Sequence, residues 1–276
     1  MRLATVRTGT GTRAARVEGD HLVLLASIDV GAVLGAEDRA FALADEEGTV
    51  LTIAEASFAT LVPRPSKVFC VGLNYRDHIL EMGREIPTDP TLFAKFPSAL
   101  IGAHDDIVIP SVSDKPDWEV ELAIVIGEPI HRATATDAHD AIAGFTVLND
   151  ISMRDWQRRT PQWLQGKTFD NTTPVGPFLV SLDELDDPFD LEVRCEIDGF
   201  VTQHDRTSEL VFGPLEIVAY CSQICTLAPG DIISTGTPAG VGDGRVPPVY
   251  LRPGQVVTST IEGVGQCVNR TVTESI

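Results

Sequence analysis

The sequence predicts an α+β fold that is mainly β, with a small N-terminal domain. Residues 122–126 form a continuously apolar run rich in β-branched side chains that stops at Gly127, which is typical of a strand buried on both faces. From residue 191 onward the pattern is mostly β, and Asp198-Gly199 between two strand-like segments is the strongest hairpin signal in the chain. Residues 214–226 form the one clear late helix, which begins at a proline.

Residues 1–64 are expected to form the small α+β domain. Short alternating segments separated by glycine-containing turns indicate a meander of strands at 3–7, 14–17 and 21–25. Residues 28–44 are mostly compatible with a helix. Two prolines within 62–66 interrupt both periodicities and mark the boundary.

The larger domain is expected over residues 65–276. It begins with an apolar strand at 67–72 and a short helix at 74–83 that Gly83 ends. Residues 85–95 contain two prolines and are expected to be irregular and to form a lid. The pattern further predicts strands at 118–126 and 145–148, helices at 136–143 and 151–158, a bend at 171–178, and strands at 191–197, 200–204, 227–235, 255–261 and 266–272.

The composition is that of an ordinary soluble globular protein. Of 276 residues 43% are hydrophobic, and the first 13 residues lack an apolar stretch. No apolar run approaches the length of about 18 residues that a membrane helix needs. We therefore expect no membrane span, no secretory signal and a cytoplasmic location. The 21 lysines and arginines against 40 acids give a net charge of −19, which argues against nucleic acid as a partner.

The five cysteines are scattered and form no CxxC pair. Cys221 and Cys225 are placed to share a face of the predicted helix, but no second close pair of cysteines or histidines completes a zinc site. We expect reduced thiols that pack as small hydrophobic side chains.

Three carboxylates suggest a metal site. Glu119 and Glu121 are two apart in a predicted strand, so they lie on one face, about 6 to 7 Å apart at the backbone. Two like charges beside a buried run need a positive partner, and a hard divalent cation is the simplest one. Asp150 follows the strand at 145–148, where a turn lines a cleft, and is the candidate third ligand. The alternative is an edge strand whose glutamates face water.

Two further pairs carry complementary chemistry. His78 and Glu81 are three apart on a predicted helix, where a carboxylate can raise the basicity of the imidazole and fix its tautomer for use as a general base. Arg154 and Gln157 share a face in the same way. Arg154 and Lys167 are candidates to bind an anionic substrate. Each pair alone is also compatible with an ordinary exposed helix.

The loop at 235–242 offers glycines for close backbone approach and threonines that can donate to a carboxylate, although a plain tight connection would use the same residues. Motifs of competing chemistries are absent from the sequence: there is no G-x-S-x-G, no H-E-x-x-H and no P-loop. The combined set favours reactions in which a metal polarises a carbonyl and an enolate develops.

With these residues in place, the sequence resembles the fumarylacetoacetate hydrolase family, in its smaller and mostly microbial branch. The resemblance covers about residues 65–276, and the motifs occur in the family's order. They are GLNYRDH and EMG within 72–83, DWEVEL at 117–122, NDISMRDWQ at 149–157, GKTFD at 166–170, PGDII at 229–233 and TGTPAGVG at 235–242.

The resemblance implies a mixed β-sandwich roll that is preceded in the chain by a small N-terminal domain and is usually a homodimer. It assigns Glu119, Glu121 and Asp150 as ligands of Mg²⁺ or Mn²⁺. It also implies that His78 and Glu81 form a water-activating dyad on a mobile lid. The residues that it implies for steadying and contacting the substrate are Lys167, Arg154, Gln157, Thr237 and Tyr75.

One departure from the family bears on the substrate. The larger animal enzyme of the family has an additional aspartate ligand before the lid histidine, where this chain has Asn74. We therefore expect a small anionic 2-oxo acid bound through the metal rather than fumarylacetoacetate.

The leading hypothesis is hydrolytic C–C cleavage of a 2,4-dioxo acid, an acylpyruvate such as fumarylpyruvate. The alternatives are decarboxylation of oxaloacetate, decarboxylation or isomerisation of a ring-cleavage product on the same site, and a ligand-binding protein without turnover.

Overall fold

The computed structural model describes residues 1–275, and of residues 45–49 it describes the backbone alone. Its strands are β1 (Arg2–Thr8), β2 (Gly11–Glu18), β3 (His21–Leu25), β4 (Asp45–Thr52), β5 (Val68–Gly72), β6 (Thr91–Lys95), β7 (Leu100–Ile101), β8 (Ile107–Ile109), β9 (Pro116–Asp117), β10 (Val120–Ile126), β11 (Ile142–Asn149), β12 (Ser152–Met153), β13 (Thr173–Val180), β14 (Glu192–Ile197), β15 (Phe200–Arg206), β16 (Ile232–Ser234), β17 (Val256–Ile261) and β18 (Gly265–Thr273). Its α-helices are α1 (Val30–Leu34), α2 (Arg39–Ala42), α3 (Arg76–Glu81), α4 (Ala135–Ala141), α5 (Arg154–Gln157), α6 (Leu164–Lys167) and α7 (Pro214–Ile224). The fold is therefore α+β and mainly β, as predicted.

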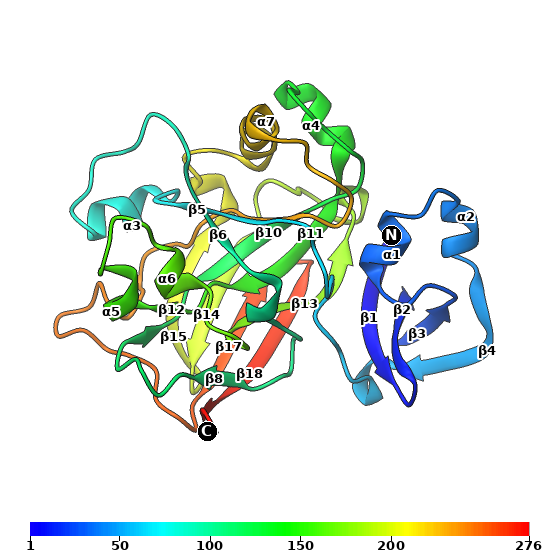
Figure 1. Ribbon diagram of the computed structural model, residues 1–276, viewed down its shortest axis with the longest axis horizontal. Helices are drawn as coiled ribbons and strands as arrows, with labels where there is room; N and C mark the ends of the chain where they lie inside the picture. The colour runs from blue at the N-terminus through cyan, green and yellow to red at the C-terminus, as the bar shows by residue number, and fades with distance from the viewer. Residues whose placement is uncertain (276) are drawn as a thin grey trace.

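Two large sheets organise the chain (Figure 1). The larger sheet has the order β4-β3-β2-β1-β13-β11-β10-β16-β5-β6, with β7 pairing β13 beside this path. The second sheet has the order β15-β14-β17-β18-β8. The N-terminal strands are thus hydrogen-bonded into the larger sheet, because β1 pairs with β13.

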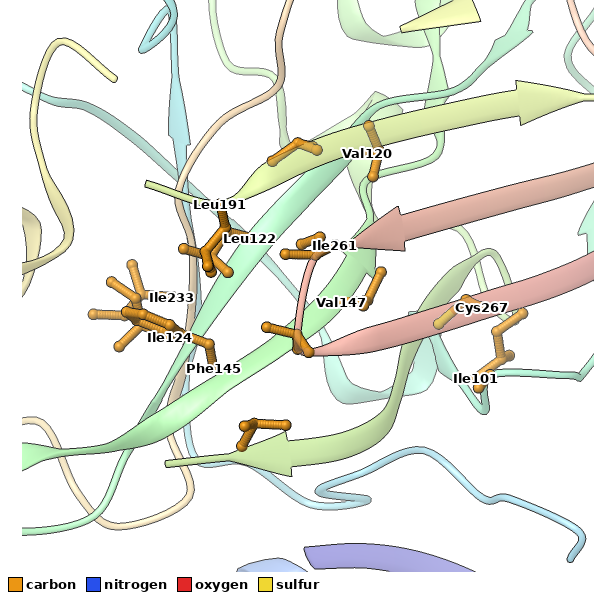
Figure 2. Close-up of a cluster of buried hydrophobic side chains, with 14 of the residues drawn as sticks. Ile101, Val120, Leu122, Ile124, Phe145, Val147, Leu191, Ile233, Ile261 and Cys267 are labelled. Atoms are coloured by element: carbon orange, nitrogen blue, oxygen red, sulfur yellow. The ribbon is translucent and has the colours of Figure 1, made fainter. Parts of the chain in front are cut away.

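The main core lies between these sheets (Figure 2). Leu122 and Ile124 of β10, Val147 of β11, Ile261 of β17 and Cys267 of β18 converge there, and all five are buried. Every residue of β10 is buried, as the continuous apolar run predicts. Burial of each large aliphatic side chain contributes about 1.5–3 kcal/mol, so this strand is held firmly in place.

Four expected elements differ from the structure. The helix expected at 28–44 is two short helices, α1 and α2, because Asp29 and Asp38 each cap a separate helix N-terminus. The bend expected at 171–178 is mostly strand β13. The strand expected at 227–235 is confined to β16, since Pro229-Gly230 forms a turn before it. The helix expected at 151–158 is reduced to α5, after the short strand β12.

The segment expected to be an irregular lid also differs. Its last five residues form β6, which pairs antiparallel with β5 from Val68↔Lys95 to Gly72↔Thr91. Among the described residues, no helix is both long enough and apolar enough to cross a membrane.

Candidate active site

Three buried carboxylates meet where β10 and β11 pair. Val120 is opposite Asn149 in this antiparallel ladder, so Glu119 and Asp150 lie side by side just beyond it, and the Asp150 amide donates to the Glu119 carbonyl at 2.8 Å. Glu121 is on the same face of the strand as Glu119. One oxygen of each carboxylate lies within 4.8 Å of the others. The three side chains predicted as metal ligands are therefore brought together.

Three buried cations surround this cluster. Lys167 Nζ lies 2.5 Å from Glu119 Oε2 and 2.8 Å from Asp150 Oδ2. Lys95 Nζ lies 2.6 Å from Asp150 Oδ1. Arg154 Nη2 lies 2.6 Å from Glu119 Oε1. Glu119 and Asp150 are thus each paired with two cations.

Glu121 is different, because no described cation contacts it. Its Oε2 accepts hydrogen bonds from the Ser234 hydroxyl at 2.5 Å and from the Gly236 amide at 2.8 Å. Burial, together with the charges of Asp150 and Glu119, raises the pKa of Glu121 well above its usual value. Burial would also raise the pKa of Glu119, but the neighbouring Arg154 and Lys167 outweigh it and lower the pKa to about 2. One buried carboxylate of the cluster is therefore left without a positive partner.

This arrangement fits a hard divalent cation. The donor set is made of carboxylate oxygens, which Mg²⁺ and Mn²⁺ prefer, and it contains neither sulfur nor imidazole among the described residues. A divalent charge would supply the partner that Glu121 lacks. The cluster also borders a cavity, which leaves room for water or a ligand beside it.

The three nitrogens of the Arg154 guanidinium have different neighbours. Its Nε donates to Asp117 Oδ2 at 2.8 Å, and its Nη1 donates to Gln157 Oε1 at 2.9 Å. Its Nη2 is ion-paired with Glu119 but makes no well-oriented hydrogen bond among the described residues. Arg154 is almost fully buried and lines the cavity, so its guanidinium charge is placed to attract an anionic ligand there.

His78 and Glu81 form the predicted pair on α3. His78 Nδ1 lies 3.3 Å from Glu81 Oε2, and the Glu81 carboxylate also accepts from the Gly240 amide at 3.2 Å. Burial would raise the pKa of Glu81, but the hydrogen bonds from His78 and Gly240 lower it overall. His78 lines the cavity that Glu119 and Glu121 also line. The other ring nitrogen, Nε2, is the one that can exchange protons with a ligand.

Of the two remaining predicted residues, Thr237 lines the cavity and Tyr75 does not. Thr237 lines the cavity, and its hydroxyl donates to the Val120 carbonyl at 2.9 Å. Tyr75 is fully buried, is not among the cavity-lining residues, and its hydroxyl has no partner among the described residues. The structure therefore does not bring Tyr75 to the cavity with the others.

Asn74 is buried and committed to backbone contacts. Its amide nitrogen donates to the carbonyls of Phe212 and Thr235, and its oxygen accepts from the Phe212 amide at 2.8 Å. Asn74 thus anchors the loop after β16, and both ends of its side-chain amide are used in contacts with the backbone.

The cavity has a volume of about 600 Å³ and reaches from the carboxylates to the surface. Its buried end includes Glu119, Glu121, Arg154 and Lys167, and Phe93 packs under Lys167 with Nζ 4.9 Å from the ring centroid. Exposed residues form its mouth, where the segments after α3 and after α5 meet. A space of this size suits a small organic ligand.

Two residues of the site were missed by sequence reasoning. Lys95 lies at the end of the segment taken as irregular, and the short apolar run Leu92–Ala94 after Pro90 is the signal that could have identified β6. Asp117 precedes Glu119 by two residues, so a third acid at the same spacing was visible. Asp117 accepts from Arg154 and from the amides of Gly242 and Asp243, which fixes the arginine and the glycine-rich loop.

Comparisons with known proteins identify the family of the chain. Residues 67–272 match the family model described as fumarylacetoacetate (FAA) hydrolase C-terminal. The chain is 48% identical over 225 residues to the mitochondrial oxaloacetate tautomerase FAHD2A of Bos taurus. The matched region covers 81% of this chain and 72% of that protein.

Two solved structures have the same fold over nearly the whole chain. A 5-carboxymethyl-2-hydroxymuconate delta-isomerase from Mycobacterium smegmatis is 35% identical, covers 100% of both chains and has a TM-score of 0.82. A fumarylacetoacetate hydrolase from Exiguobacterium antarcticum is 31% identical, covers 99% of this chain and 100% of that one, and has a TM-score of 0.88. These matches confirm the predicted family-type fold.

Proposed function

The chain belongs to the fumarylacetoacetate hydrolase family, and we propose that it is a divalent-metal-dependent enzyme that converts a small 2-oxo acid through its enol form. The observation that supports this proposal most strongly is that Glu121 is buried and has no cationic partner among the described residues. A buried carboxylate without a cationic partner, beside two others and at the end of a cavity, calls for a metal ion.

Glu119, Glu121 and Asp150 would hold Mg²⁺ or Mn²⁺. Such an ion supplies Lewis-acid polarisation of a 2-oxo group and stabilises the negative charge that develops on its oxygen. The protein then needs to orient the substrate, exclude water and handle one proton.

Orientation falls to the cationic donors at the buried end. The guanidinium of Arg154, which Gln157 and Asp117 hold in place, can bind the substrate's 1-carboxylate through Nη2, whose contact with Glu119 is not a well-oriented hydrogen bond. Lys167 is fixed by Glu119 and Asp150 and adds positive charge beside the 2-oxo oxygen. Thr237, in the loop after β16, lines the same cavity.

Proton transfer falls to His78. With Nδ1–H directed at Glu81, the lone pair on Nε2 can accept a proton from the carbon next to the 2-oxo group. Glu81 fixes this tautomer and balances the imidazolium that forms. Return of the proton to the oxygen completes the keto-to-enol conversion.

The first candidate reaction is tautomerisation of oxaloacetate. It needs only the proton movement just described, and the relative that is 48% identical is named as an oxaloacetate tautomerase. The balance is simple, since one C–H bond breaks, one O–H bond forms and no other reactant is consumed.

The second candidate is hydrolysis of an acylpyruvate such as fumarylpyruvate, and the His78–Glu81 pair favours it. Here Nε2 would take a proton from water, the hydroxide would add to the 4-carbonyl, and the C3–C4 bond would break to give an organic acid and the enol of pyruvate. Oxaloacetate decarboxylation would use the same enol-stabilising groups without an attacking water.

We also propose that the enzyme acts as a homodimer in the cytoplasm, although the Bos taurus relative is named as mitochondrial. The homodimer is an expectation from the family alone. Sedimentation of the purified chain would test it.

A turnover experiment tests the proposed function. Purified protein is offered oxaloacetate, acetylpyruvate and fumarylpyruvate with Mg²⁺, with Mn²⁺ and with EDTA. We expect EDTA-sensitive conversion, with faster keto–enol interconversion, followed by the enol absorbance, for a tautomerase and release of pyruvate together with an organic acid from an acylpyruvate for a hydrolase. Conversion that survives EDTA, or that survives in Glu121→Gln, would contradict the metal-dependent proposal.

A further inference from the structure

Three arginines line the mouth of the cavity. Arg84 follows α3, and Arg158 and Arg159 follow α5; all three line the same cavity as the carboxylate cluster and all are exposed. Figure 1 shows α3 and α5 at the same end of the molecule. The cavity therefore has cationic groups at both ends, since Arg154 and Lys167 lie at the buried end.

The three arginines are not equally committed. Arg158 is ion-paired with Asp243, which also accepts from Tyr250. Arg84 and Arg159 have no carboxylate within ion-pair distance among the described side chains. Two guanidinium groups at the mouth are thus free to bind an anion.

Arg159 is also held in place. Its guanidinium lies 3.4 Å from the centroid of the Trp156 ring. Trp156 is fixed in turn, because its indole N–H donates to the Val112 carbonyl at 3.0 Å and its ring packs edge-on against Phe169. Stacking of this kind leaves the N–H edge of a guanidinium open, and a preorganised donor loses less entropy on binding.

The acidic charge of the chain as a whole makes the arginines at the cavity mouth stand out as a place where anions can bind. The net charge is −19, so most of the surface repels anions. A local group of arginines at one cavity mouth gives an incoming anion a favourable approach there.

We propose that Arg159 and Arg84 bind a second carboxylate at the far end of the substrate, so that the site selects 2-oxo dicarboxylic acids over 2-oxo monocarboxylic acids. This inference rests on the proposed function, because the buried end must hold the 2-oxo acid group. The cavity volume of about 600 Å³ leaves room for a dicarboxylic acid that is longer than oxaloacetate. The far carboxylate of such a longer acid can reach the mouth.

Binding of two matched ligands tests this inference without turnover. 2-Oxoadipate and 2-oxohexanoate have the same carbon chain and differ only in the distal carboxylate. Calorimetric titration with Mg²⁺ at low ionic strength should give an affinity for 2-oxoadipate that is at least about tenfold higher, as expected for charge-assisted hydrogen bonds. The double variant Arg84→Gln/Arg159→Gln should lose this preference and keep the affinity for 2-oxohexanoate.

Two controls separate the outcomes. Arg270→Gln removes an exposed arginine of β18, away from the cavity-lining residues, and should keep the preference. Equal affinity for both ligands in the unaltered protein, or an equal loss for both in the double variant, would overturn the distal-carboxylate inference alone. Failure to bind either ligand would overturn the proposed function as well.

Discussion

Lys95 Nζ lies 2.6 Å from Asp150 Oδ1, and both side chains are fully buried. The pairing of β6 with β5 carries Lys95 into the site, while the end of β11 carries Asp150 there. Removing one partner of a buried pair leaves an uncompensated charge, which typically costs about 3–5 kcal/mol. This contact therefore couples the edge of the large sheet to the carboxylate cluster.

Replacing Lys95 by Met tests that coupling. We expect the free energy of unfolding to fall by about 3–5 kcal/mol in EDTA. A saturating divalent metal should recover part of this loss, because it supplies charge to the cluster. Denaturant unfolding with and without Mg²⁺ measures both effects. An unchanged midpoint in EDTA would show that the pair does not stabilise the fold.

Glu121 and Glu119 should respond in opposite ways to the same substitution. Glu121→Gln removes a charge that no cation balances and keeps the oxygen that accepts from Ser234, so stability in EDTA should hold or rise while metal binding is lost. Glu119→Gln leaves Arg154 and Lys167 short of a partner and should cost about 3–5 kcal/mol. Thermal unfolding across a Mg²⁺ titration distinguishes them, and matching losses of stability would contradict this assignment of charges.

His78→Gln should separate proton transfer from metal binding. General acid–base catalysis typically contributes about 10²–10⁴-fold, so we expect kcat to fall by that factor. Metal affinity should stay the same, because His78 is not part of the carboxylate cluster. Calorimetric Mg²⁺ titration beside turnover checks both quantities. A large loss of metal affinity would assign His78 to the metal rather than to the proton.

The lowered pKa of Glu81 predicts that the free energy of unfolding depends on pH. The pKa of Glu81 in the folded chain lies below the ordinary value of 4.5, since hydrogen bonds from His78 and Gly240 outweigh burial. The ionised carboxylate therefore stabilises the fold above about pH 4.5, and this contribution is lost as the pH falls through the lowered pKa.

Glu81→Gln lacks that contribution at every pH. The difference in melting temperature between the unaltered protein and the variant should be largest near pH 6 and shrink towards pH 3. Melting curves across this range provide the measurement, and a difference that grows in acid would reverse the sign of the linkage.

The sequence was sufficient to predict that the three carboxylates lie together. An unbroken apolar run identified β10, and strand periodicity put Glu119 and Glu121 on one face without any knowledge of the partner strands. Asp150 was proposed as the third carboxylate because acids at strand ends line clefts. These inferences depend on local geometry, which the sequence specifies directly.

Longer-range contacts could not be found in this way. Lys95 enters the site only through the register of β6 on β5, which no local pattern fixes. β13 was taken as a bend because of Pro174 and Pro177. In the structure Pro174 pairs only with the short β7, and Pro177 falls where the register on β11 shifts, between Gly176 and Val180. Prolines are tolerated where the ladder is interrupted.

The division into domains at residue 64 stays a prediction, but the pairing of β1 with β13 has a practical consequence for truncation. Leu3 lies opposite Leu179, and both are buried. Expression of residues 65–276 alone would convert an interior strand into an open edge with unpaired amides and carbonyls and an apolar side chain uncovered. Such edges recruit other strands, so the shortened chain should self-associate into insoluble material rather than remain a working catalytic unit.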